Sequence, residues 1–325
     1  MIKTAIATLT LALATHVQAA DRADWPQTLV IGTGSPGAVY GIYGQGVAGV
    51  ISRHVGVPAS TQQTQGPNQN LVLLHKGRID IAMSTMGPAY EAWTAELDLD
   101  PGTRYENMRG VLPMYNTAFQ VAALERTGIK SVGDLDGKVL GTGPKGGTGS
   151  YWKRWLDILD IEVTERNGPL GDQASQLADG RLDAVATAAG LPTSAFSELE
   201  AQVPATIFSF SQEQIDQLLP KLPYASVTEI PAGTYQSLKA PIKTLGMWNF
   251  VIVDHEMPED LVYEITKAVL EHPDEMVNTH ASAKETLAAN VLKNDFMPLH
   301  PGAVRYYRER GIDIPEKLLP PEMKQ

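Results

Sequence analysis

A segment that occurs twice constrains the fold of this chain more than any other feature. Residues 76–82 read KGRIDIA, and residues 179–185 read DGRLDAV. In both places a predicted helix ends, a glycine follows and a predicted strand begins. Alternating helices and strands are typical of mostly parallel sheets with helices on both faces. The duplication therefore predicts an α/β chain built from two similar lobes.

Glycine-rich turns lie upstream of both copies and extend the similarity. Each turn follows a predicted strand and precedes a predicted helix, so glycine separates otherwise regular segments. The first lobe is predicted to contain a strand at 28–32, helices at 39–54 and 68–75, and a strand at 79–84. The second is predicted to contain a strand at 138–141, helices at 151–160 and 174–178, and a strand at 182–187.

Two extended segments, 111–116 and 244–249, are predicted to cross between the lobes. The crossings predict lobe I from residues 21–112 plus 249–325 and lobe II from residues 113–248. In open parallel sheets, ligands bind beyond the carboxyl ends of the strands. Two facing lobes bring four such ends into one cleft, namely the loops near 33–40, 84–90, 142–150 and 187–192.

The composition excludes several classes of protein. The chain has 325 residues and a formal net charge of −11 without any block of Lys and Arg, so nucleic acid is not an expected partner. It contains no cysteine, which excludes disulfides and thiolate chemistry. Residues 1–20 combine Lys3, an apolar run over 5–15 and small residues at 17 and 19, the pattern of a secretory signal peptide. We therefore expect the mature chain outside the cytoplasm, without a lipid on an N-terminal cysteine.

Two glycine motifs resemble nucleotide-binding sequences but lack residues that such sites need. Residues 32–37 and 141–146 both match G-x-G-x-x-G. A dinucleotide site also needs an acidic residue about 20 positions later, and after Gly37 none occurs before Asp80. The second copy is followed by acidic residues near that distance, but Gly147 stands where a phosphate loop needs Lys. Nucleotide cofactors and hydride chemistry are therefore not expected.

Residues for catalysis or metal binding do not occur at the required spacing. The sequence has no G-x-S-x-G and no H-E-x-x-H motif, and its seven histidines are scattered. No acid–base or nucleophile set can be assembled, so we expect no enzyme activity, cofactor or metal site. Both glycine-rich turns do offer backbone N–H groups at a helix N-terminus, which attract anions. We predict that the turn at 143–150 holds a small anion such as a carboxylate.

An ordered set of stretches, spanning nearly the whole chain after the signal peptide, carries a family resemblance. The stretches are 32–40 (GTGSPGAVY), 64–70 (TQGPNQN), 143–149 (GPKGGTG), 179–184 (DGRLDA) with Gly190, 230–235 (IPAGTY) and 299–307 (LHPGAVRYY). With these stretches the sequence resembles the TAXI family of extracytoplasmic solute-binding proteins, which serve tripartite ATP-independent periplasmic (TRAP) transporters.

The resemblance implies a two-lobed type II periplasmic-binding fold that closes on its ligand in the periplasm and delivers it to a TRAP permease. Family members are associated with glutamate, glutamine or 2-oxoglutarate. This chain has Thr85-Met86-Gly87 where many members have a Gln-Ser-Asp-like tripeptide, and so it lacks a carboxylate to pair with an ammonium group. An oxo- or dicarboxylate is therefore favoured, with a glutamate-like amino acid next. A protein that presents its ligand to a membrane sensor kinase is the alternative.

Within such a fold the ligand is expected to meet hydroxyl groups, backbone N–H groups and an aromatic wall. Tyr40 and Tyr115 are predicted to form the wall, and Lys145 or Arg154 to add positive charge. The full set of predicted ligand-binding residues is Ser35, Tyr40, Thr85, Tyr115, Thr148, Gly149, Ser150, Thr187 and Gly190.

Overall fold

The computed structural model describes residues 22–35 and 38–324. The signal peptide predicted at residues 1–20 lies outside this part of the chain. In the described residues, no helix combines the length and the apolar character that crossing a membrane requires.

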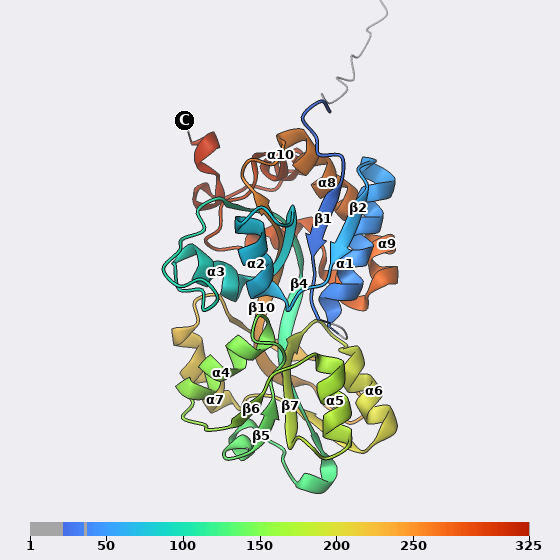
Figure 1. Cartoon of the computed structure of the whole chain (residues 1–325), viewed down its shortest axis with the longest axis vertical. Helices are drawn as coiled ribbons and strands as arrows, with labels where there is room; N and C mark the ends of the chain where they lie inside the picture. Colours follow the sequence, from blue (N-terminus) through green and yellow to red (C-terminus); the bar gives the residue numbers. More distant parts are fainter. Residues whose placement is uncertain (1–21, 36–37, 325) are drawn as a thin grey trace, which may run out of the picture.

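One mixed sheet of ten described strands runs through both lobes, in the order β2-β1-β3-β10-β4-β7-β5-β6, with β8 paired to β4 and β9 to β10. Figure 1 shows this sheet along the long axis of the molecule. The strands are β1 (Leu29–Gly32), β2 (Ala59–Gln62), β3 (Ile81–Thr85), β4 (Met108–Leu124), β5 (Val139–Gly141), β6 (Thr164–Arg166), β7 (Ala184–Ala189), β8 (Ala205–Phe208), β9 (Ser226–Ile230) and β10 (Ile242–Asp254).

Helices cover the sheet in both lobes, as Figure 1 shows, with α4 to α7 in one lobe and α1 to α3 and α8 to α10 in the other. The helices are α1 (Val39–Val50, continued by a π-helical turn at Ile51–Val55), α2 (Pro67–His75), α3 (Met86–Trp93), α4 (Thr148–Ile158), α5 (Leu170–Ala178), α6 (Ser194–Gln202), α7 (Gln212–Leu218), α8 (Glu259–Glu271), α9 (Pro273–Thr279) and α10 (Pro301–Glu309).

The long strands β4 and β10 connect the lobes, as the two extended crossing segments predicted. They pair antiparallel with each other, from Gly246 opposite Ala118 to Asp254 opposite Met108. The parallel pairing predicted for each lobe is confirmed for the outer strands, where β1 pairs with β2 and β3, and β5 pairs with β6 and β7. The crossing strands run antiparallel to all their neighbours, because the chain enters lobe II along β4 and returns along β10.

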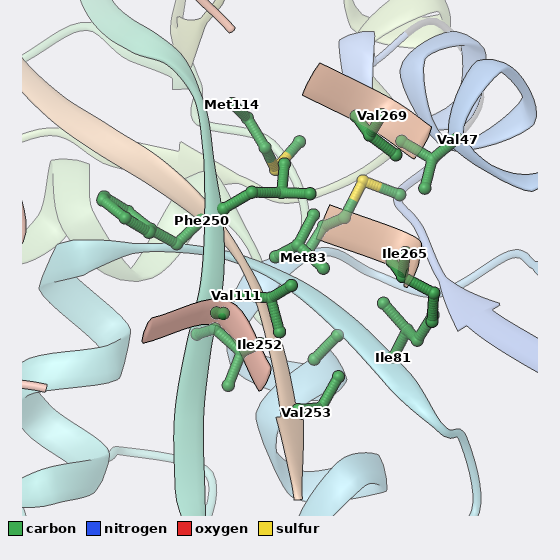
Figure 2. Close-up of a cluster of buried hydrophobic side chains, with 14 of the residues drawn as sticks. Val47, Ile81, Met83, Val111, Met114, Phe250, Ile252, Val253, Ile265 and Val269 are labelled. Carbon is green, nitrogen blue, oxygen red and sulfur yellow. The ribbon is translucent and has the colours of Figure 1, made fainter. Parts of the chain in front are cut away.

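The hydrophobic core divides near the middle of the two crossing strands. The core of lobe I includes residues of β4 up to Tyr115 and of β10 from Phe250 onward. Figure 2 shows part of it, with Met83 of β3 among side chains from α1, β4, β10 and α8. Lobe II holds two further clusters, which include residues of β4 from Ala118 onward and of β10 up to Met247. Each lobe therefore buries its own apolar surface.

The duplicated segment has the same structural role in both lobes. Gly77 and Gly180 adopt positive φ angles of 60° and 73°, which favour glycine, and each ends a helix. The next acidic residue then binds the neighbouring strand: Asp80 Oδ2 accepts from Val30 N at 2.7 Å, and Asp183 Oδ2 accepts from Val139 N at 2.8 Å. The similarity of the two lobes predicted from the sequence is thus present in their hydrogen bonds.

Candidate ligand-binding site

A small cavity of about 50 Å³ lies between the lobes. Lobe I lines it with the turn after β1, the start of α2 and the end of β3, and the crossing strands β4 and β10 line it near their middles. Lobe II lines it with the turn after β5, the start of α4, the start of α5 and the end of β7. The cavity therefore lies at the carboxyl ends of parallel strands, where ligands of such sheets bind.

Several helices begin at this cavity. The first residues of α1, α2, α4 and α5, namely Val39, Pro67, Thr148 and Leu170, all line it. Thr85, which precedes α3, lines it as well. The N-terminal end of a helix carries about half a positive charge. Five helix N-termini thus lie at one cavity that no cationic side chain lines among the described residues, an arrangement that favours an anion.

An aromatic and amide network forms the wall of the cavity along the crossing strands. Tyr40 OH donates to Asn249 Oδ1 at 2.6 Å, and Asn249 Nδ2 donates to the Tyr115 carbonyl and to Thr117 Oγ1, both at 2.7 Å. Asn249 reaches these partners because the register of β10 against β4 shifts between Trp248 and Phe250. Burial raises the pKa of the Tyr40 and Tyr115 phenols well above their usual range. Both phenols therefore remain neutral hydrogen-bonding groups.

The two lobes touch around the cavity through polar groups. Thr85 Oγ1 lies 2.7 Å from Tyr151 OH, and Gly146 N donates to Gln65 Oε1 at 3.0 Å. On the same side, Asn68 Nδ2 donates to Ser150 Oγ at 3.2 Å. The structure is consequently that of a closed molecule, in which residues from both lobes enclose the cavity.

One backbone contact between the lobes depends on glycine. A Cβ atom on Gly147 would lie 2.4 Å from the carbonyl oxygen of Gln65 in the opposite lobe. Gly66 has a φ of 126°, and a Cβ there would lie 3.2 Å from Gly147 Cα. Side chains at these two positions would hold the lobes apart, so the glycines permit the closed arrangement.

The structure brings most of the predicted ligand-binding residues together. Six of them line the cavity: Ser35, Tyr40, Thr85, Tyr115, Thr148 and Thr187. The other three do not. Ser150 bonds to Asn68 across the lobes, and Gly149 fits against Asn167 and the Pro144 carbonyl. Gly190 allows Tyr115 and Ser282 to pack against the end of β7.

The turn at 143–150 is not the open cradle that the sequence predicted. The N–H groups of Gly147 and Gly149 donate to the Pro144 carbonyl, and Ser150 N donates to the Gly147 carbonyl. Thr148 Oγ1 donates to the Thr142 carbonyl at 3.0 Å. Gly143 N and Gly146 N donate to the side-chain oxygens of Gln173 and Gln65. Most N–H groups of the turn are therefore already bonded within the protein, and among the described hydrogen bonds those of Lys145 and Thr148 have no acceptor.

Neither predicted cationic side chain is among the residues that line the cavity. Lys145 lines a more open depression that adjoins the cavity and shares Ser35, Gln65 and Pro144 with it. Arg154 pairs with Glu91 at 2.5 Å, which joins α4 of lobe II to α3 of lobe I. Among the described residues that line the cavity, none is charged and none is histidine. The groups available to a ligand there are hydroxyls, amides and backbone N–H groups.

Sequence reasoning missed several cavity residues. Gln65 and Gly66 lie in a stretch that carried the family resemblance but was not assigned to the site, and both line the cavity. Tyr151, Asn249 and Thr117 also line it. A polar Asn inside the apolar run of β10 was the available signal, because a buried amide requires partners.

Two lobes on one continuous sheet, with a cavity between them, define the two-lobed periplasmic-binding-protein fold. The chain belongs to the NMT1-like family, whose sequence profile matches residues 31–311. Its structure is similar to that of MatC from Rhodopseudomonas palustris with bound malate, at 12% identity and a TM-score of 0.55, covering 87% of this chain and 95% of that one. It is also similar to another R. palustris protein, with adipate, at 17% identity and a TM-score of 0.52, covering 78% and 87%. At these identities the similarity establishes the fold alone.

Proposed function

We propose that this protein is a periplasmic solute-binding receptor that captures a small organic anion and delivers it to a TRAP permease. The favoured ligands are oxo- and dicarboxylates, with a glutamate-like amino acid next. The receptor returns its ligand chemically unaltered. Its two lobes, residues 21–112 plus 249–325 and residues 113–248, close on the ligand as units.

The convergence of helix N-termini on a cavity without charged side chains carries this proposal. Val39, Pro67, Thr148 and Leu170 each begin a helix there, and helix N-termini bind anions. No Asp or Glu lines the cavity among the described residues, so an ammonium group would be buried without a counter-charge, which is costly. Malate in MatC and adipate in the other R. palustris protein are ligands of the class that such a cavity favours.

The permease as partner is supported by the resemblance of ordered stretches, from 32–40 to 299–307, to the TAXI family. Membership of the NMT1-like family is compatible with a receptor and leaves the transporter class open. Deleting the gene for the permease tests the partner directly. Loss of uptake of the bound anion supports delivery to a permease, and intact uptake with loss of a transcriptional response favours a sensor.

Calorimetric titration of the mature protein tests the ligand class. The protein is unfolded and refolded first, so that any co-purified ligand is removed. We expect 2-oxoglutarate, malate or adipate to saturate it, and the matching diamide of the best ligand to bind at least about 100-fold more weakly, because a charge-assisted hydrogen bond is worth roughly 1.5–3 kcal/mol. Equal affinity for the diamide would contradict an anion site. Mass spectrometry of the recovered ligand should show no product.

A further inference from the structure

Two histidines and a glutamate that are far apart in the sequence meet on the surface of lobe I. His54 lies in the π-helical turn after α1, His272 lies between α8 and α9, and Glu275 lies in the first turn of α9. Their potential ligand atoms all lie within 4.8 Å of one another. His54 Nε2 is 2.7 Å from Glu275 Oε1, and the two imidazole rings stack with centroids 3.5 Å apart.

The hydrogen bonds around this cluster orient the groups that would hold a metal ion, which would take the place of the proton between His54 Nε2 and Glu275 Oε1. His272 Nδ1 lies 2.8 Å from the Ala268 carbonyl, so Nδ1 carries the proton and Nε2 keeps a free lone pair. Glu275 Oε2 accepts from Arg53 Nε at 3.0 Å, while Oε1 faces His54. Metal-binding imidazoles and carboxylates are commonly oriented by such outer hydrogen bonds.

We propose that His54, His272 and Glu275 form a binding site for a divalent transition-metal ion, with Zn²⁺ as the best match. Two imidazole nitrogens and one carboxylate are an established zinc ligand set, with water in the remaining position. The side chain of His54 is 30% exposed, so its ring has room to turn from the stacked position toward a shared ion. The site connects the end of α1 to the α8–α9 junction, and the bound ion stabilises lobe I.

This metal site is separate from the cavity between the lobes. Helix α1 begins at the cavity with Val39 and reaches His54 through the π-helical turn, a path of roughly 20 Å at the usual rise per residue. All three ligands belong to the same lobe, so closure of the lobes neither forms nor breaks the site. Metal binding is therefore expected to be independent of anion binding. A failure to bind metal would not contradict the proposed anion receptor, and a failure to bind an anion would not contradict the metal site.

Titration of Zn²⁺ into the mature protein, purified without a histidine tag and freed of metal with a chelator, tests the proposal. We expect one equivalent to bind and to raise the melting temperature. His54→Ala and His272→Ala should each weaken binding by at least about ten-fold and remove the rise in melting temperature. Glu275→Gln, which keeps the shape of the side chain beside Arg53, is the further variant if an alanine variant does not fold.

His255→Ala is the matched control, because His255 is another partly exposed histidine of lobe I, 3.9 Å from Asp254 and 3.8 Å from Glu322. It should bind Zn²⁺ as the unaltered protein does, and all variants should melt alike in chelator. The proposal is overturned if the unaltered protein shows no saturable binding. It is equally overturned if the His54 and His272 variants bind as tightly as the control.

Discussion

The strand–turn–helix units of lobe I and lobe II use the same contacts up to the glycine-rich turn and different contacts beyond it. In lobe I, Gly32 ends β1 against the side chains of Asn70 and Ile79. In lobe II, Gly141 ends β5 against Gln173 and Leu182. An amide from the second helix after the strand, α2 or α5, thus lies beside the glycine in both lobes. A Cβ atom would lie 2.7 Å from Asn70 Oδ1 at Gly32 and 3.1 Å from Gln173 Cδ at Gly141.

Beyond the turn the lobes contribute different groups to the cavity. Lobe I presents Ser35 and the phenol of Tyr40, which the Asn249 amide holds in place. In the turn of lobe II most N–H groups are already bonded within the protein, and Gly147 lies against the backbone of Gln65. The framework common to both lobes therefore positions both turns. Contact with the ligand through Tyr40 in lobe I, and closure of the lobes at Gly147 in lobe II, depend on residues that are not part of the duplicated segment.

The largest expected effect comes from breaking the glycine contact between the lobes. Gly147→Ala places a Cβ atom 2.4 Å from the Gln65 carbonyl oxygen, so the lobes cannot close fully on a ligand. We expect the affinity to fall about 100-fold, which corresponds to about 2.7 kcal/mol. Calorimetric titration measures this loss.

Gly168→Ala is the control for Gly147→Ala. A Cβ atom on Gly168 would lie 4.0 Å from Gln173 Nε2, an ordinary contact within lobe II. We expect normal affinity in the control and similar melting temperatures for both empty variants. Normal affinity in Gly147→Ala would show that the lobes do not need the observed contact to bind a ligand.

The ion pair between Glu91 of α3 and Arg154 of α4 predicts that the stability of the protein depends on pH. Burial, which outweighs the nearby Arg154 guanidinium, raises the pKa of Glu91 from 4.5 to about 7. The folded chain then holds this proton more tightly than the unfolded chain, so the free energy of unfolding decreases as pH rises from about 4.5 to 7. The change is on the order of 2 kcal/mol.

Glu91→Gln should remove this part of the pH dependence, because glutamine does not titrate. Urea unfolding at pH 5 and pH 8 measures the difference, with the exposed Glu198→Gln of lobe II as the control that keeps the slope of the unaltered protein. If the free energy of unfolding of Glu91→Gln changes with pH as much as that of the unaltered protein, a group other than Glu91 causes the pH dependence.

The duplicated aspartates allow a matched test of the shared framework. Asp80→Ala and Asp183→Ala each leave one strand N–H, that of Val30 or Val139, without its carboxylate acceptor. We expect each to lower the free energy of unfolding by about 1.5 kcal/mol, the lower end for hydrogen bonds to charged groups. Unequal losses, measured by urea unfolding, would show that the two lobes do not depend equally on the repeated contact.

The repeated framework is predictable from the sequence because its signals are local. A glycine after a helix and an acidic residue at the start of a strand recur at 77–80 and 180–183, and both copies form the predicted turn. The start of α4 is predicted three residues too late. Gly149 is a poor helix former, but a larger residue would meet the Pro144 carbonyl at 2.9 Å, so tertiary packing overrides the propensity.

The composition of the cavity is less predictable because it depends on how distant segments meet. Asn249 reaches Tyr40 only through a register shift between β10 and β4. Tyr151 faces Thr85 only when α4 of lobe II closes on lobe I. His54 likewise meets His272 and Glu275 only because α1 packs against α8 and α9. Sequence spacing contains no signal for such contacts.

The smallest expected effect concerns the single hydroxyl contact between Thr85 and Tyr151. Tyr151→Phe removes the phenol oxygen, which lies 2.7 Å from Thr85 Oγ1, and keeps the ring in the core of lobe II. A neutral hydrogen bond contributes about 1 kcal/mol, so we expect ligand affinity to fall about five-fold and the melting temperature of the empty protein to change little. Tyr105→Phe is the control, because Tyr105 OH bonds to Asp100 within lobe I at 2.8 Å and should affect stability without affecting affinity. If Tyr151→Phe instead lowers stability and leaves affinity unchanged, the Thr85–Tyr151 contact supports the fold rather than closure of the lobes.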